Sequence, residues 1–230
     1  MKKILAIVIA VIVLAGAFQF ASARDWLPSF GDSKAAATIT GDLGNAVSTD
    51  ISDVSGHWAE ETIRAIVEEG WMTASNGRFR PDDQLTRAEY VAILARITGA
   101  ELPESGNLPF TDVSGSAWYR GALIWANDNH IISGTSYNSF SPNSLITRQD
   151  AVLTLDRTLG LINWSLNRSR TPSVFSDIDT VSEYARDAVN GMASTEVIVP
   201  LSDGTFRPRE AFSRAELTVW LVGLLQAKVA

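Results

Sequence analysis

The peptide LTRAEY spans residues 85–90, and two related peptides follow it, ITRQDA at residues 146–151 and FSRAEL at residues 212–217. Each begins with an apolar residue, continues with a hydroxyl residue and an arginine, and carries an acid at its fifth position. A peptide used three times in 230 residues indicates an internal repeat. A repeat constrains the whole architecture, so the flanking sequence is expected to recur as well.

The flanking sequence recurs in three blocks. They open with DVSGHWAEETI at residue 53, DVSGSAWYRGAL at residue 112 and DIDTVSEYARDAV at residue 177. Within each block a phenylalanine precedes a proline by two residues and the hydroxyl residue by seven, as Phe79 precedes Pro81 and Thr86. The differences in length fall in two turns, which is typical of duplicated folded units. These spacings predict repeats over residues 51–99, 110–160 and 175–226.

Each block is predicted to form a helix, a turn and a second helix, so the fold class is all-α or mainly helical. The first helix is expected to start directly after Asp53, Asp112 or Asp177, with the Asp stretch as its N-cap. Its buried stripe is expected to include an aromatic residue and the apolar residues five and eight positions later. The second helix begins at the LTRAEY-type peptide. Because such short helices cannot bury their stripes alone, the blocks are expected to pack on one another.

The hydroxyl residue and the acid of the repeated peptide match a helix capping box. In this motif the hydroxyl accepts from the N3 amide, and the acid accepts from the N-cap amide. Thr86 with Glu89 and Ser213 with Glu216 fit it, whereas Asp150 is a methylene shorter and makes a weaker box with Thr147. Loss of such a cap costs about 1 kcal/mol. Capping therefore accounts for the hydroxyl and the acid.

Capping does not account for the arginine. Arg87, Arg148 and Arg214 occupy the first helical position, where the macrodipole makes positive charge mildly unfavourable. The residues leave two interpretations open. The guanidinium pairs with an internal carboxylate, such as one on the neighbouring block, or it faces an external anion, for which a helix N-terminus and a planar fork of donors are suited.

Composition narrows the function. The net charge is −7 and no run of Lys or Arg is present, which argues against nucleic acid as a partner. Cysteine is absent, so disulfides, thiolate nucleophiles and Cys-based zinc sites are excluded. The two histidines, His57 and His130, are not part of any hydrolase or metalloprotease motif. We therefore expect no enzymatic activity, no catalytic residues, no cofactor and no metal.

The N-terminus predicts export. Two lysines precede an apolar run, and small residues follow where a signal peptidase cleaves, so residues 1–23 are predicted to be a signal peptide. The alternative is an uncleaved N-terminal anchor, which would be the only contact with a membrane. Residues 24–50 lack helical or strand periodicity and are interpreted as a linker. The folded part is expected to be secreted, at the cell wall or cell surface.

The repeated frame resembles the S-layer homology (SLH) domain family. The resemblance is carried by DVSGHWAEETI, NGRFRPDDQLTRAEY, FTDVSGSAWY, SFSPNSLITRQDA, FSDIDTVSEYA and DGTFRPREAFSRAEL, and it spans residues 51–226. It implies a three-lobed, pseudo-threefold helical module outside a bacterium. Such modules bind cell-wall polysaccharide, either a secondary cell-wall polymer or a peptidoglycan-linked glycan, in grooves between the lobes. The implied function is non-covalent attachment to the cell envelope.

The resemblance also implies a set of ligand-binding residues. The arginine of the repeated peptide contacts an acidic sugar, the acid two positions later shapes the site, and the Asp and the aromatic near the first helix line the groove. The residues concerned are Arg87, Arg148 and Arg214; Glu89, Asp150 and Glu216; Asp53, Asp112 and Asp177; and Trp58, Trp118 and Tyr184. For the aromatics, packing in the core is equally open.

Departures from the family pattern indicate that the grooves differ. The second block has Gln149-Asp150 in place of Ala-Glu, and the third has Ser213 in place of Thr. The alternative function is a structural or protein-interaction module of the envelope, in which the three arginines form internal salt bridges and other envelope proteins are the partners.

Overall fold

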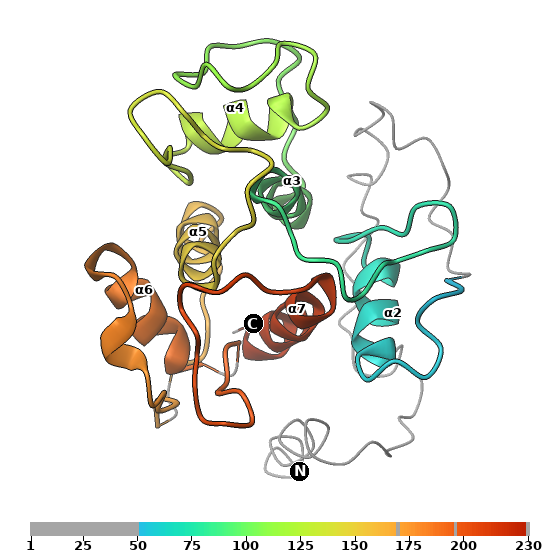
Figure 1. Cartoon of the computed structure of the whole chain (residues 1–230), viewed down its shortest axis with the longest axis vertical. Helices are drawn as coiled ribbons and strands as arrows, with labels where there is room; N and C mark the ends of the chain where they lie inside the picture. The colour runs from blue at the N-terminus through green and yellow to red at the C-terminus, as the bar shows by residue number, and fades with distance from the viewer. Residues whose placement is uncertain (1–50, 169–170, 196, 229–230) are drawn as a thin grey trace.

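The computed structural model describes residues 51–168, 171–195 and 197–228. The predicted signal peptide and linker lie outside these residues. The described part forms six α-helices and a 3-10 helix (Figure 1): α2 (Glu60–Glu68), α3 (Arg87–Thr98), α4 (Arg120–Asp128), α5 (Arg148–Leu161), η3 (Ile178–Thr180), α6 (Glu183–Ala193) and α7 (Arg214–Ala227). The only β-pairing between these residues is isolated bridges, so the mainly helical prediction is confirmed. None of these helices has the length and apolar character needed to cross a membrane.

The second helix of each repeat begins at the predicted residue. Thr86, Thr147 and Ser213 are the N-caps of α3, α5 and α7, and each hydroxyl accepts from the amide three residues later. Complete capping boxes form at α3 and α7. At α5 only the hydroxyl half is present, because the shorter Asp150 side chain does not return to the cap amide. The prediction of two full boxes and one weaker box is confirmed.

The first helices begin later than predicted, and the aspartates are not their caps. Helices α2, α4 and α6 start at Glu60, Arg120 and Glu183, and none has a side-chain cap hydrogen bond. The Asp53 carboxylate instead accepts from the Phe79 amide at 2.8 Å and from the Arg80 amide at 2.8 Å. Asp112 and Asp177 hold the equivalent turns in the same way. Each carboxylate thus closes a turn, and the helix that it was predicted to cap starts well after it, at Glu60, Arg120 or Glu183.

Each held turn contains a residue with left-handed backbone. Arg80, Ser141 and Arg207 have φ of 58°, 57° and 56°, a conformation that side chains other than glycine and asparagine rarely adopt. The two amides that donate to the Asp carboxylate belong to this left-handed residue and to the Phe before it, as Arg80 and Phe79 show for Asp53. We infer that the aspartate stabilises the turn between the two helices of its own repeat.

The three aromatics at the first helices lie outside the predicted buried stripe. Trp58, Trp118 and Tyr184 are 60%, 56% and 58% exposed, so the expectation that they pack in the core is wrong. Because α2 and α4 begin after the tryptophans, each tryptophan precedes the first residue of its helix and is not part of the helix's buried face. The stripe residues five and eight positions later are fully buried, as predicted: Ile63, Ile66, Leu123, Ala126, Val189 and Met192.

The helices pack in a cyclic order. Each second helix packs on the first helix of the next repeat, giving the pairs α3 with α4, α5 with α6, and α7 with α2. Figure 1 shows α3, α5 and α7 in the centre and α2, α4 and α6 around them. The last helix of the chain therefore completes the lobe that the first helix begins. No repeat buries its own pair of helices by itself.

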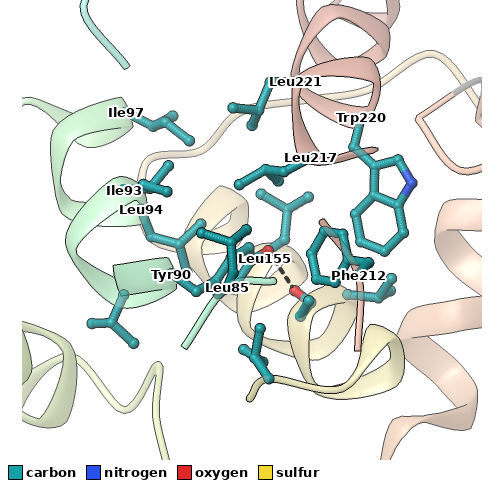
Figure 2. Packing of buried hydrophobic residues seen from close by; sticks show 14 of the residues in the cluster. Leu85, Tyr90, Ile93, Leu94, Ile97, Leu155, Phe212, Leu217, Trp220 and Leu221 are labelled. Carbon is teal, nitrogen blue, oxygen red and sulfur yellow. Dashed lines mark hydrogen bonds between the residues drawn. The ribbon is translucent and has the colours of Figure 1, made fainter. Parts of the chain in front are cut away.

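The central helices contribute the middle of the core (Figure 2). The residues four and eight positions after the capping hydroxyl are all fully buried, as predicted: Tyr90, Leu94, Ala151, Leu155, Leu217 and Leu221. The Tyr90 hydroxyl donates to the Ala151 carbonyl oxygen at 2.8 Å. Burial raises the pKa of Tyr90, so this phenol stays a neutral donor. One polar contact thus links α3 to α5 inside an otherwise apolar centre.

Candidate functional site

The arginine of each repeated peptide enters the turn of another repeat. Its Nε donates to the carbonyl oxygen of the Phe that precedes Pro: Arg87 to Phe140 at 2.9 Å, Arg148 to Phe206 at 2.7 Å, and Arg214 to Phe79 at 2.8 Å. The contacts form a cycle: the arginine of the first repeat bonds to the second repeat, that of the second to the third, and that of the third to the first. These arginines therefore join the repeats through main-chain carbonyls.

The main-chain amide of each arginine is also hydrogen-bonded to the next repeat of the cycle. The amides of Arg87, Arg148 and Arg214 donate at 2.9 Å to the carbonyl oxygens of Ser144, Glu210 and Asp83, again in the next repeat of the cycle. The N-terminal amides of a helix have no partner within the helix. Here the neighbouring turn supplies that partner. The helix start is thus a joint between two repeats.

Each guanidinium also lies over aromatic rings. Arg87 and Arg214 lie 4.6 Å from the ring centres of Phe140 and Phe79. Arg148 lies between 5.2 and 5.7 Å from the rings of Phe206, Phe212 and Trp220. Burial lowers the pKa of all three arginines, and that of Arg214 falls to about 10. All three remain charged at neutral pH, held by cation–π contacts and carbonyls.

The carboxylate partners differ among the three arginines. Arg148 pairs with Glu216 at 2.9 Å, and Arg87 lies 3.8 Å from Asp150. For Arg214, no carboxylate in the described part of the chain lies within 4.0 Å. An internal carboxylate therefore explains Arg148 well, Arg87 weakly and Arg214 not at all. The partner common to all three, a main-chain carbonyl, belonged to neither interpretation drawn from the sequence.

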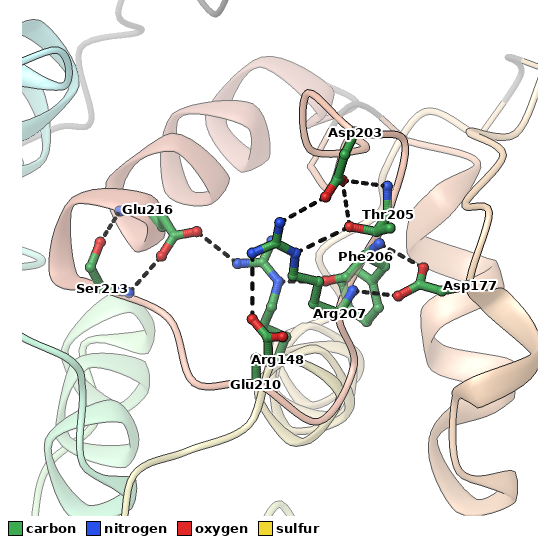
Figure 3. Close-up of polar contacts among 9 residues, drawn as sticks. All are labelled: Arg148, Asp177, Asp203, Thr205, Phe206, Arg207, Glu210, Ser213 and Glu216. Carbon is green, nitrogen blue, oxygen red and sulfur yellow. Dashed lines mark hydrogen bonds and ion pairs between the residues drawn. The ribbon is translucent and has the colours of Figure 1, made fainter.

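Figure 3 shows the complete joint around Arg148. Asp177 holds the turn amides of Phe206 and Arg207, and the Phe206 carbonyl accepts from Arg148. Arg148 also donates to Glu216, and Glu216 in turn accepts from the Ser213 amide at 2.7 Å. The acid, the turn, the arginine and the helix cap thus form one connected network across two repeats.

The exposed aromatics lie beside these joints. The Tyr184 hydroxyl donates to Asp150 at 2.7 Å, and Asp150 faces Arg87. One groove therefore combines an arginine, an acid and an aromatic from three successive repeats. Helix α2 packs on α7, where the Thr62 and Thr218 hydroxyl oxygens lie 2.8 Å apart, and α4 packs on α3. By the symmetry of the repeats, Trp58 and Trp118 are the counterparts of Tyr184 at these two helix pairs.

The predicted site residues thus separate into two groups. Arg87, Asp150 and Tyr184 meet between α5 and α6, and Arg148 meets Glu216, whereas Asp53, Asp112 and Asp177 face turn amides. The sequence reasoning missed the Phe carbonyls as arginine partners. The available signal was the constant spacing between the Phe and the hydroxyl residue. Among the described residues, no three His, Asp or Glu side chains are placed to hold a metal ion.

The S-layer homology domain family matches residues 50–91, 109–152 and 174–218, more than half of the chain. The chain belongs to this family, as its repeats predicted, and it carries three tandem copies of the domain. The signal peptide (residues 1–23), the linker (residues 24–50) and the exact ends of the repeats remain predictions.

Similar proteins carry the same region within longer chains. The surface-layer 125 kDa protein of Lysinibacillus sphaericus is 28% identical over 73% of this chain and 13% of its own length. The cellulosome-anchoring protein of Acetivibrio thermocellus is 25% identical over 61% of this chain and 32% of its own. The amylopullulanase of Thermoanaerobacterium thermosulfurigenes is 26% identical over 76% of this chain and 9% of its own. The chain spans a third or less of each.

Proposed function

We propose that this protein attaches non-covalently to the bacterial cell envelope by binding cell-wall polysaccharide in the grooves between its repeats. The observation that supports this most directly is the exposure of Trp58, Trp118 and Tyr184 at equivalent positions. A large aromatic side chain that is more than half exposed contributes little to the packing of the core. Exposed apolar side chains that recur at equivalent positions mark interaction sites. The names of two relatives, a surface-layer protein and a cellulosome-anchoring protein, agree with a location at the cell surface.

The chemistry of the grooves suits a sugar polymer. An aromatic ring with one face in solvent offers a flat apolar platform for the C–H face of a pyranose, and the neighbouring acid and arginine offer hydrogen-bond partners for its hydroxyl or acidic groups. Asp150 lies beside Tyr184, and Glu89 and Glu216 are its counterparts in the other two repeats. More than one such groove on one body multiplies a weak affinity by avidity. The chain is proposed to need no enzymatic activity for this role.

The arginines are proposed to form the floors of these grooves. Their Nε atoms are committed to carbonyls, so only the outer guanidinium nitrogens are available to an acidic sugar. Arg214 has no ion pair with any residue that the structure describes, and its Nη2 donates to the Thr73 carbonyl. Arg148 is only 3% exposed and already pairs with Glu216, so in its groove contact with a ligand is left mainly to the exposed aromatic Trp58.

The alternative function is a structural or protein-interaction module of the envelope. The inward contacts of Arg87, Arg148 and Arg214 favour it in part, since each arginine joins two repeats. It does not explain why the three equivalent aromatics are exposed. The two functions therefore differ in what the aromatics do, and the test should change the aromatics and leave the joints intact.

The test is retention of the purified chain by isolated cell-wall sacculi. Trp58→Ala with Trp118→Ala is expected to reduce retention at least tenfold, in the range reported for loss of aromatic contacts in binding sites. Tyr137→Ala is the matched control, because Tyr137 is a fully exposed aromatic on the hairpin closed by Ser136 and Ser139, and it is not one of the three equivalent aromatics. Unchanged retention of the double variant, with Tyr137→Ala equally retained, would contradict the proposal.

A further inference from the structure

Two departures from the repeat pattern meet in space at the groove between α5 and α6. The second repeat has Gln149-Asp150 where the other two repeats have Ala-Glu. The third repeat has Tyr184 where the other two have tryptophan. The Gln149 Nε2 donates to the Tyr184 hydroxyl oxygen at 2.9 Å, and the Tyr184 hydroxyl donates to Asp150 at 2.7 Å. The polar side chains of Gln149 and Asp150 are thus hydrogen-bonded to Tyr184, about 35 positions later in the sequence.

The same network fastens the start of α6. The Ser182 amide donates to the Gln149 Oε1 at 2.9 Å, and the Gln149 Nε2 also approaches the Ser182 Oγ at 3.1 Å. Gln149 is only 4% exposed, so its amide is satisfied inside the protein. Ser182 is the N-cap of α6 and its own side chain makes no cap hydrogen bond. The glutamine therefore accepts from the N-cap amide, as the returning acid of a capping box does, and ties α6 to α5.

The other two grooves lack this network. Ala88 and Ala215 occupy the position of Gln149 and have no polar side chain. The indoles of Trp58 and Trp118 make no hydrogen bond to any described residue. Glu89 and Glu216 serve their own helix caps, and Glu216 also pairs with Arg148. In these grooves the aromatic is not tied to the acid beside it.

We propose that the groove between α5 and α6 is closed by its own side chains, and that the chain binds wall polymer through the other two grooves. This proposal rests on the proposed function. Every polar group that would read a sugar there is engaged: Asp150 by Tyr184 and Arg87, and the Tyr184 hydroxyl by Gln149 and Asp150. A ligand would have to break this network before gaining any contact. Burial and the hydrogen bond to Asp150 raise the pKa of Tyr184 to about 12, so the phenol remains a donor at physiological pH.

The first test compares retention by purified sacculi for single changes at the three aromatics. Trp58→Ala and Trp118→Ala are each expected to reduce retention several-fold, whereas Tyr184→Ala leaves it within twofold of the unchanged chain. An equal loss for Tyr184→Ala, in a variant whose circular dichroism is unchanged, would overturn the proposal. A converse variant combines Gln149→Ala, Asp150→Glu and Tyr184→Trp, which reproduces the pattern of the other repeats, and is expected to increase retention.

The second test needs no ligand. In Gln149→Ala the Ser182 amide loses its acceptor, so its hydrogen exchange is expected to accelerate about tenfold. The amide of Arg214, at the joint between the third and first repeats, should exchange at the unchanged rate. Alanine is the residue at this position in both other repeats, so the variant is expected to fold. Unchanged exchange at Ser182 would overturn the closed groove. If the unchanged chain is not retained by sacculi, the proposed function fails, and this exchange result alone decides whether the network holds the groove shut.

Discussion

The Nε of Arg214 donates to the carbonyl oxygen of Phe79 at 2.8 Å, across 135 positions of sequence. This contact joins the last repeat to the first and closes the cycle that Arg87 and Arg148 begin. The guanidinium also lies over the Phe79 ring and donates to the Thr73 carbonyl at 2.9 Å. Because the same arginine position makes all three joints, the repeated peptide is the means by which three short units become one domain.

Arg214→Ala is expected to destabilise the whole chain by about 2 to 4 kcal/mol, because it leaves buried carbonyls without donors. Arg214→Lys should lose nearly as much, since an ammonium cannot span both carbonyls as the planar fork does. Urea denaturation of each variant measures the change. Arg209→Ala is the control, because Arg209 is exposed in the same repeat. A loss below 0.5 kcal/mol for Arg214→Ala would show that the joint contributes little.

Removal of the third repeat is expected to abolish cooperative unfolding of the remainder. A chain that ends at residue 168 keeps α2 to α5 but lacks α6 and α7, so the packed faces of α5 and α2 lose their partners. Linear repeat arrays tolerate such a loss, because each repeat contacts only its neighbours. A closed cycle does not, because both open ends lose an interface. Thermal unfolding followed by circular dichroism tests this, with the chain from residue 51 to residue 230 as the control that should melt in one sharp transition.

The parts of this fold that the sequence predicted depend on contacts within one helix turn. Thr86 and Glu89 lie three residues apart, so the capping box could be identified from the spacing alone. The weaker box at Thr147 followed from the length of the Asp side chain. The buried stripes of the second helices followed from their period. Each of these features is local, and local chemistry determines its outcome.

The features that were missed depend on partners in distant turns. Asp53 has the properties of a helix cap, but two amides 26 and 27 positions away form its hydrogen bonds, so α2 begins later than predicted. The partner of Arg87 is the main-chain carbonyl of Phe140, and any residue type could supply such an oxygen. The site arginines were therefore identified as residues that capping does not explain, but their partners required the tertiary structure.

The three helix caps are expected to differ in strength. Thr86→Ala removes the acceptor for the Glu89 amide and the bond that the hydroxyl donates to the Glu89 carboxylate, and should cost about 1 to 2 kcal/mol. Thr147→Ala removes only the hydroxyl acceptor for the Asp150 amide and should cost less, about 0.5 to 1 kcal/mol. Ser202→Ala, at an exposed position of the third repeat, controls for loss of a hydroxyl. Urea midpoints rank the variants, and an equal loss for Thr86→Ala and Thr147→Ala would show that the bond from the Thr86 hydroxyl to the Glu89 carboxylate adds nothing to the cap.

Stability is expected to fall in acid through the aspartates that hold the turns. Burial raises the pKa of Asp112, but the hydrogen bonds from the Phe140 and Ser141 amides outweigh it, so the pKa lies below the usual 3.8. The pKa of Asp53 is lowered in the same way by its own turn amides. A carboxyl with a lowered pKa in the folded state binds fewer protons there than when unfolded. Its stabilisation is complete above the unfolded pKa and is lost as the pH falls through the folded pKa.

The melting temperature should therefore begin to decrease below about pH 4.5 and continue to decrease below pH 3.8. Asp112→Asn removes one of the two charges, so at neutral pH it should cost about 1 kcal/mol, the lower end for charge-assisted hydrogen bonds at an exposed site. It should also flatten the acid decrease without abolishing it, because Asp53 remains. Asp128→Asn, at an exposed position on α4, should leave the profile unchanged. An Asp112→Asn profile as steep as that of the unchanged chain would show that the turn carboxylates do not control acid stability.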